Sequence, residues 1–163
     1  MGVSPSKKVH QTLLTSSTFT STCTTTYTDS LTLSQSQGIL PYQLYPTSLR
    51  LHQSLISTCP LIDKWAPDPP SRLHVDSAYK SLRRTNHRTS ETLDSAEFRD
   101  FAAVLFTNVV VENAGKAVLS RVPVGIVGIA GVAVVAKVGR GFVATAVGAY
   151  ALGVATSVYL SLG

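Results

Sequence analysis

The sequence predicts an all-α protein wherever it is ordered, with a Gly/Ala-rich transmembrane helix or helical hairpin at its C-terminal end. Three observations support this class. Ser and Thr dominate the first third of the chain, the middle repeats apolar residues at helical spacing, and the last quarter is almost free of charge. The formal net charge of +5 favours anionic partners, meaning lipid headgroups or nucleic acid.

Residues 1–46 are expected to form a disordered tail. From Thr12 to Ser36, sixteen of twenty-five residues are Ser or Thr, and Asp29 carries the only charge. Such a segment offers too little apolar surface to offset the entropy lost on ordering. An organellar transit peptide is an alternative interpretation, because the segment is hydroxylated and nearly free of acidic residues. The absence of arginine before Arg50 argues against it.

The first eight residues match the pattern for N-myristoylation. Gly2 follows the initiator Met, Ser6 stands at the required spacing, and Lys7 and Lys8 follow. A single acyl chain binds membranes only marginally and needs a second signal, which an apolar C-terminus would supply. Gly2 is therefore a candidate acylation site, and acylation predicts the plasma membrane. Cleavage of a transit peptide predicts an organelle membrane instead.

Residues 47–70 are predicted to contain a weak short helix followed by a stiff linker. The helix covers Thr47–Thr58, where Leu51 and Leu55 share one side. Three prolines between Pro67 and Pro70 then stop any helix and favour an extended spacer.

A basic amphipathic helix is predicted over residues 71–88, with Ser71 as its N-cap. Its apolar stripe follows the i, i+3, i+4, i+7 spacing and consists of Val75, Ala78, Tyr79 and Leu82. Its opposite surface carries the membrane-surface candidates Arg72, Lys80, Arg83 and Arg84. One interpretation places this helix on an anionic membrane, and the other packs it against its own chain. Nucleic-acid binding is disfavoured, because no aromatic residues alternate with the basic ones.

A second amphipathic helix is predicted over residues 94–121. Asp94 and Glu97 have the spacing of a capping box directly before an apolar run. The apolar face is wide, but polar residues interrupt it too often for a membrane span. Pro123 then permits a change of direction.

The apolar segment 122–163 divides into two runs at Lys137 and Arg140. The short run, 122–136, would reach only ~22 Å as a helix, whereas 141–162 would reach ~33 Å and cross a ~30 Å hydrocarbon core. Lys137 and Arg140 are expected to fix the depth of the segment in the membrane. A hairpin of two helices and a single span are both compatible with this pattern. The absence of basic residues beyond Arg140 favours the single span.

Small residues recur at every fourth position of the long run. Such a face lets two membrane helices approach closely. The predicted helix-packing face consists of Gly141, Thr145, Ala149, Gly153 and Ser157. We therefore expect a partner helix or a homo-oligomer in the bilayer.

No catalytic, cofactor-binding or metal-ligating pattern is expected. The four histidines are scattered, and Cys23 and Cys59 stand far apart in polar sequence. Gly139–Ala144 matches the start of a dinucleotide site, but the required acidic residue about twenty positions later is missing.

The sequence therefore predicts a small non-enzymatic integral membrane protein, a scaffold or regulatory subunit anchored by its C-terminus with its N-terminal region in the cytosol. Two alternatives stay open. One is a soluble helical interaction or regulatory protein, and the other is an organelle-imported membrane protein whose N-terminal region is a transit peptide.

Overall fold

A computed structural model describes residues 4–86, 90–136 and 140–162, and between 122 and 147 it describes the helical backbone only. Every regular element in these ranges is a helix, which confirms the all-α class. The chain divides into two units, Met1–Val111 and Glu112–Gly163. The helices are α1 (Pro5–Thr15), α2 (Ser17–Ser34), η1 (Pro41–Gln43), α3 (Leu44–Thr58), α4 (Pro60–Trp65), α5 (Arg72–Thr85), α6 (Ser95–Ala136) and α7 (Arg140–Leu160).

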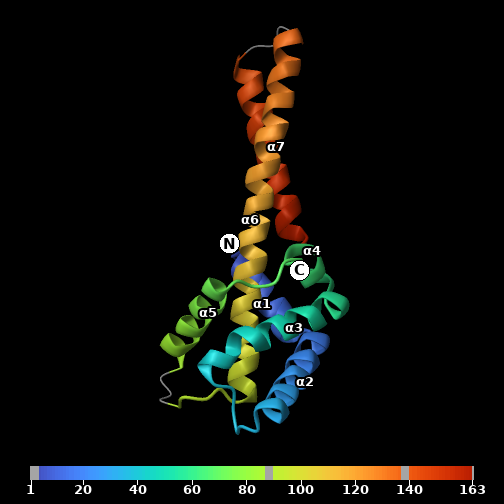
Figure 1. The fold of residues 1–163 in the computed structure, drawn as a ribbon. Coiled ribbons are helices and arrows are strands. Elements are labelled where there is room, and N and C mark those ends of the chain that lie inside the picture. The colour runs from blue at the N-terminus through green and yellow to red at the C-terminus, as the bar shows by residue number, and fades with distance from the viewer. Residues whose placement is uncertain (1–3, 87–89, 137–139, 163) are drawn as a thin grey trace. The chain divides into compact units, whose positions relative to one another are not determined.

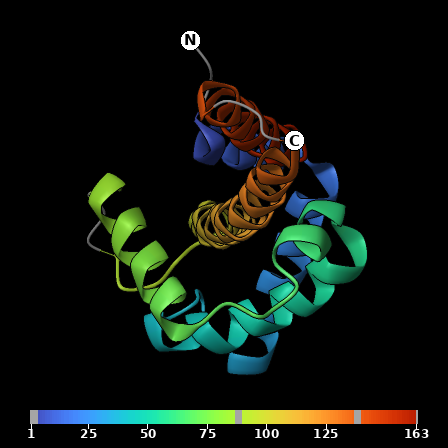
Figure 2. The same cartoon turned by 90° about the horizontal axis from the view of Figure 1, so that it is seen from above.

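The first part of α6 forms the core of unit 1. Figures 1 and 2 show it passing through the middle of this unit, with α2, α3 and α5 arranged around it. Its apolar face is fully buried and includes Phe98, Phe101, Leu105 and Phe106. Burying one such side chain contributes about 1.5–3 kcal/mol, so this face is the main source of hydrophobic stabilisation in the unit.

The start of α6 confirms the predicted capping box. The Glu97 backbone N–H donates to Asp94 Oδ1 over 2.8 Å, and the Asp94 N–H donates to Glu97 Oε2 over 3.2 Å. The helix then continues to Ala136. Residues 94–121 and 122–136, expected as two segments, thus belong to one helix that runs through Pro123. A proline inside a helix removes one backbone hydrogen bond, and long apolar helices tolerate this loss when neighbouring groups satisfy the backbone.

The N-terminal region differs from the expected disordered tail, because residues 5–34 form α1 and α2. Their buried apolar side chains lie four to six residues apart and are Val9, Leu13, Phe19, Cys23 and Tyr27. This sparse stripe is enough to cover the face of α6. The Phe19 ring meets the edge of Phe106 at 6.4 Å between centroids, and Tyr27 lies 5.9 Å from Phe98. The sequence composition did not indicate this apolar stripe, because Ser and Thr are far more numerous in the segment and occupy its outer surface.

Most of the threonine hydroxyls of α2 for which a bond is described are satisfied within the helix itself, whereas the buried Ser30 hydroxyl has no partner. The Thr22 hydroxyl donates to the Thr18 carbonyl over 2.8 Å, and Thr28 donates to Thr24 over 3.0 Å. Such bonds from a side chain to the carbonyl four residues earlier let threonine occupy a helix without losing a polar partner. The Ser16 hydroxyl caps the start of α2 by accepting from the Phe19 N–H.

The turn after α2 is fixed against the start of α6. Gln35 adopts a left-handed backbone conformation with φ of 51°. A Cβ on Gly38 would lie 2.7 Å from the Thr92 Cβ, so only glycine fits there. Ile39 and Leu93 then exchange two backbone hydrogen bonds of 3.1 and 2.8 Å. The Tyr27 hydroxyl also donates to the Leu93 carbonyl.

Helices α3 and α4 occupy the region expected to be a weak helix and a linker. Pro60 stands in the first turn of α4, where its missing N–H costs nothing. His52 of α3 stacks on Phe106 with 6.2 Å between centroids, and its Nε2–H donates to the Ala66 carbonyl over 2.7 Å. That bond holds the end of α4 against the core. Only residues after Ala66 remain a proline-rich connection to α5.

Unit 2 contains the rest of α6 and α7. Arg121 of α6 lines one groove together with Tyr150, Val154 and Ser157 of α7. The position of Arg121 beside the second half of α7 indicates that the two helices run in opposite directions (Figure 1). Within unit 2 these two helices form a helical hairpin, and the choice between a membrane hairpin and a single span stays a prediction. Residues 137–139, which include Lys137, lie outside the described ranges.

Replacement of Phe19 by Ala tests whether the N-terminal helices are part of the core. We expect a loss of about 3–5 kcal/mol in the free energy of unfolding, because the change leaves a cavity against Phe106. Leu33→Ala on the same helix is the control, since Leu33 is 68% exposed and should change stability by less than about 0.5 kcal/mol. Chemical denaturation followed by circular dichroism measures both. Equal, negligible effects would show that the first 36 residues do not pack.

Candidate functional site

One helix in the described part of the chain, Ser95–Arg121, is long and apolar enough to cross a membrane. Length and composition alone do not decide this, because the core helix of a soluble domain meets the same criterion. Nearly half of its most apolar stretch is buried inside the structure, and its first turns form the core of unit 1. The predicted span 141–162 falls partly on residues whose side chains lie outside the description. Its described apolar part is Gly148–Leu160.

Unit 2 exposes large apolar side chains on both of its helices. Leu119 of α6 is 75% exposed, and Leu152 and Leu160 of α7 are 70% and 64% exposed. Single exposed leucines are common on soluble proteins. Here they accompany two runs without a charged residue, 122–136 and 141–163. Exposed apolar surface, where it is contiguous, marks a contact with lipid or with another protein.

The described part of the predicted helix-packing face is open. Ala149, Gly153 and Ser157 are all exposed. A Cβ on Gly153 would meet no atom within 4 Å. Gly153 and Ser157 also line the groove that Arg121 of α6 borders, so this exposed face includes part of that groove. For Gly141, Thr145 and Arg140, the first residue of α7, the structure describes the backbone only.

The four basic residues predicted to bind a membrane surface have different surroundings in the structure. Ser71 caps α5 as predicted, accepting from the His74 N–H. The Arg72 guanidinium lies 4.7 Å from the centre of the Tyr45 ring, and Arg83 donates to the Tyr79 hydroxyl and the Ser90 carbonyl. Arg72, Lys80 and Arg84 are all exposed, and Arg83 is half-buried.

The apolar stripe of α5 is used inside the protein. Val75, Ala78 and Leu82 are buried in unit 1. An interfacial helix needs its apolar face to enter the lipid, and that face is occupied here. Packing against its own chain, the second interpretation of the sequence, therefore accounts for α5 better. Lys80 and Arg84 retain only an electrostatic means of attracting an anionic surface.

Cys23 offers little nucleophilic reactivity. Cys23 and Cys59 are both buried and unpaired. Burial raises the pKa of Cys23 from its ordinary value of 9.0 to about 12, although the nearby charge of Arg99 lowers it in part. The thiol is therefore protonated at neutral pH and is a poor nucleophile. In the described part of the chain, no three His, Cys, Asp or Glu residues are grouped as metal ligands.

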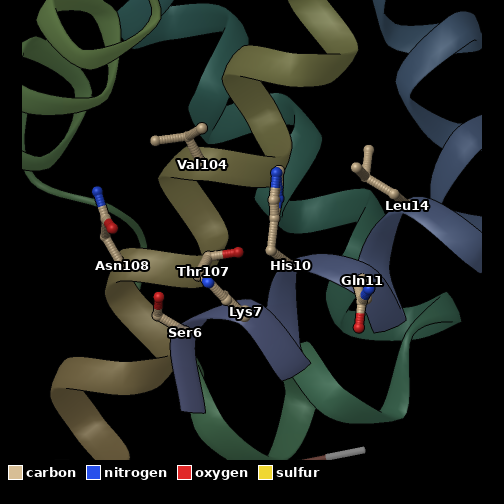
Figure 3. Close-up of a pocket in the computed structure, with 8 residues that line it drawn as sticks. All are labelled: Ser6, Lys7, His10, Gln11, Leu14, Val104, Thr107 and Asn108. Atoms are coloured by element: carbon tan, nitrogen blue, oxygen red, sulfur yellow. The ribbon is translucent and has the colours of Figure 1, made fainter. Parts of the chain in front are cut away.

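A cavity of about 470 Å³ lies between α1 and α6 within unit 1. Figure 3 shows the described side chains that line it, and all of them belong to these two helices. They are Ser6, Lys7, His10, Gln11, Leu14, Val104, Thr107 and Asn108. Two buried polar atoms on this lining, His10 Nδ1 and Thr107 Oγ1, have no hydrogen-bond partner.

The sequence did not reveal this cavity. His10 belongs to a segment expected to be disordered, and Thr107 counted only as an interruption of an apolar face. The one available signal is a hydroxyl residue between Phe106 and Val109–Val110, all of them buried. That signal says nothing about which helix faces Thr107, because the packing of α1 decides it.

Comparison of the chain with protein-family models, with curated proteins and with solved structures finds no match.

Replacing Arg83 and Lys80 separately by Gln tests the division of the basic residues. Each change removes one positive charge from α5. We expect Arg83→Gln to lower the free energy of unfolding by about 1 kcal/mol, since it removes the bond to the Ser90 carbonyl. Lys80→Gln should leave stability within about 0.5 kcal/mol. Chemical denaturation measures both, and equal losses would contradict a specific role for Arg83.

Proposed function

We propose that this protein is a small, non-enzymatic integral membrane protein whose unit 2 is the anchor and whose unit 1 is a folded helical module outside the bilayer. The observation that carries this proposal is the exposed apolar surface of unit 2, with Leu119, Leu152 and Leu160 uncovered on two helices. A lipid environment is the simplest way to remove such a surface from water.

The lengths of the helices support the anchor. The last twenty residues of α6, 117–136, would reach ~30 Å, and the twenty-one residues of α7 would reach ~32 Å. Either length matches the ~30 Å hydrocarbon core. Arg121 lies one turn inside this part of α6, where a long basic side chain can extend toward the headgroups.

The part of α6 in unit 1 is also apolar enough to cross a membrane, but we assign it another role. Phe98, Phe101 and Phe106 are buried against the N-terminal helices, so this part is a core helix. The membrane-embedded part of α6 therefore begins beyond Glu112, where unit 2 starts.

Unit 1 is assigned to the cytosol. Its two cysteines are unpaired, as is usual in a reducing compartment. The hairpin carries Lys116 and Arg121 near one end and Lys137 and Arg140 near the other. Because these basic residues are equal in number, the positive-inside rule does not orient it. Gly2 lies outside the described residues, and its acylation stays a prediction.

The proposed role in the membrane is association with another helix. Ala149, Gly153 and Ser157 present an open, narrow face on α7, as close helix packing in lipid requires. A scaffold or a regulatory subunit would use such a face to bind its partner or a second copy. The alternative is a soluble interaction module, in which a protein partner covers the same apolar surface.

Alkaline carbonate extraction of membranes separates the two proposals. We expect the full-length protein to stay in the pellet. Leu152→Arg should shift part of it to the supernatant, because an arginine near the centre of a span costs about 2.5–3.5 kcal/mol. Leu73→Arg is the control, since Leu73 is 80% exposed on α5 in unit 1. Complete extraction of the unmodified protein would favour the soluble module.

Replacing Gly153 by Leu tests the association face. We expect the affinity between chains in proteoliposomes to fall about threefold to tenfold, since the added side chain separates the helices. Gly148→Leu is the matched control, because Gly148 lies on α7 outside the small-residue register and also has open space around it. Energy transfer between labelled chains measures both. Equal behaviour of the two variants would exclude this face.

A further inference from the structure

A groove in unit 2 follows one face of α7. Its lining residues on α7 are Tyr150, Gly153, Val154 and Ser157, which share a face because they stand at i, i+3, i+4 and i+7. Arg121 of α6 borders the same groove. Gly153 contributes no side chain, and a Cβ added there would meet nothing within 4 Å. The result is an open groove ~10 Å long with a guanidinium beside it.

The charge of Arg121 has no counter-ion in this groove. Arg121 is exposed, and no Asp or Glu is among the lining residues. The sequence has no acidic residue after Glu112, whose carboxylate already accepts from Lys116 Nζ over 2.6 Å. Within the described part of unit 2, Arg121 makes no ion pair. A basic side chain in a membrane segment normally finds a partner of opposite charge, so the groove favours an anion supplied from outside the chain.

We propose that this groove binds one anionic phospholipid of the surrounding bilayer. The Arg121 guanidinium would bind the phosphate through two parallel N–H groups, and the Ser157 hydroxyl would donate a further hydrogen bond. One acyl chain would then lie along Gly153 and Val154. The inference rests on the proposed membrane insertion of unit 2, because the bilayer supplies the ligand.

The depth of these two polar groups suits a headgroup. Arg121 lies one turn inside the proposed membrane part of α6, and Ser157 lies one turn before the end of α7 at Leu160. Because the two helices run in opposite directions (Figure 1), both residues are near the same end of the anchor. Arginine side chains at such positions extend toward the lipid phosphates. The groove leads from there along α7 to Tyr150, toward the region of the acyl chains.

The lining selects an anionic headgroup over a zwitterionic one. A choline headgroup brings its own ammonium group, for which the groove has no acidic residue. Basic sites between membrane helices bind anionic headgroups. The volume of about 270 Å³ lies just below the ~300–1,000 Å³ of sites that enclose a small molecule. The groove therefore has room for the phosphate and part of one chain, while the rest of the lipid stays in the bilayer.

The groove and the association face share Gly153 and Ser157. A bound lipid and a partner helix therefore compete for this part of α7. A second copy of this chain would bring no acidic residue to Arg121, since none follows Glu112. An anionic lipid neutralises the guanidinium, whereas self-association leaves it without a counter-ion, and this difference favours the lipid as the occupant of the groove.

Native mass spectrometry of the full-length protein in a nonionic detergent tests the proposal. The probes are phosphatidylglycerol and phosphatidylcholine with the same acyl chains, and only the monomer peak is read, so association between chains does not enter. We expect one phosphatidylglycerol to bind about tenfold more tightly than phosphatidylcholine, since the anionic lipid alone leaves its phosphate unopposed for Arg121. Equal affinity for the two lipids would overturn the proposal.

Carbonate extraction reports on the anchor separately. A protein that stays in the membrane pellet but shows no preference for phosphatidylglycerol would contradict this inference and leave the proposed anchor intact.

Arg121→Gln locates the bound phosphate. We expect it to weaken phosphatidylglycerol binding about tenfold or more, because hydrogen bonds to a charged group are lost. Lys116→Gln is the matched control, since it removes the same charge from unit 2 at a residue that does not line the groove, and it should change the affinity by less than about twofold. Arg121→Lys keeps the charge but not the paired N–H groups, and should weaken binding severalfold.

Gly153→Leu locates the acyl chain. We expect the leucine to fill the groove and weaken phosphatidylglycerol binding severalfold, whereas Gly148→Leu, placed outside the groove with equally open space around it, should not. Equal losses in Arg121→Gln and Lys116→Gln would indicate a general attraction between charges and overturn the assignment to this groove. Unchanged affinity in both Arg121→Gln and Gly153→Leu would overturn it as well, since both residues are exposed and their replacement leaves the packing of unit 2 intact.

Discussion

The contact on which unit 1 depends is the packing of other helices against the aromatic face of α6. Phe106 alone joins three elements, because Phe19 of α2 meets its edge and His52 of α3 stacks on its face. His52 in turn fixes the end of α4 through the Ala66 carbonyl. The many Ser and Thr residues of α2 can stay helical only because this face gives its few apolar side chains somewhere to pack. An isolated helix of this composition would be marginal in water.

The same helix connects two different kinds of surface. Between Phe98 and Val110 most apolar residues of α6 are buried in protein, whereas Leu119 is exposed. Apolar composition therefore has two physical meanings along one continuous helix. In unit 1 it builds a core, and in unit 2 it forms a surface that needs lipid or a partner. A hydropathy profile averages these two situations, since it counts side chains and not what surrounds them.

In the described part of the chain, four buried side-chain atoms have no hydrogen-bond partner: His10 Nδ1, Ser30 Oγ, Arg99 Nε and Thr107 Oγ1. Along α2, one hydroxyl after another bonds to the carbonyl four residues earlier. Thr107 has the same opportunity in α6 and does not use it. Ser30 of α2 shares this property, so an unused intrahelical bond occurs on both helices.

Local chemistry determined a good part of this protein from the sequence alone. The capping box at Asp94, the Ser71 cap and the apolar stripe of α5 follow from the spacing of a few neighbouring residues, and the structure confirms them. Tertiary structure decided the rest. The apolar stripe from Val9 to Tyr27 is too sparse to predict a helix unless the face of α6 that it covers is known. Pro123 does not end α6, which continues from Ser95 to Ala136. The cavity also depends on how α1 meets α6, because spacing within a helix carries no information about which distant helix packs against it.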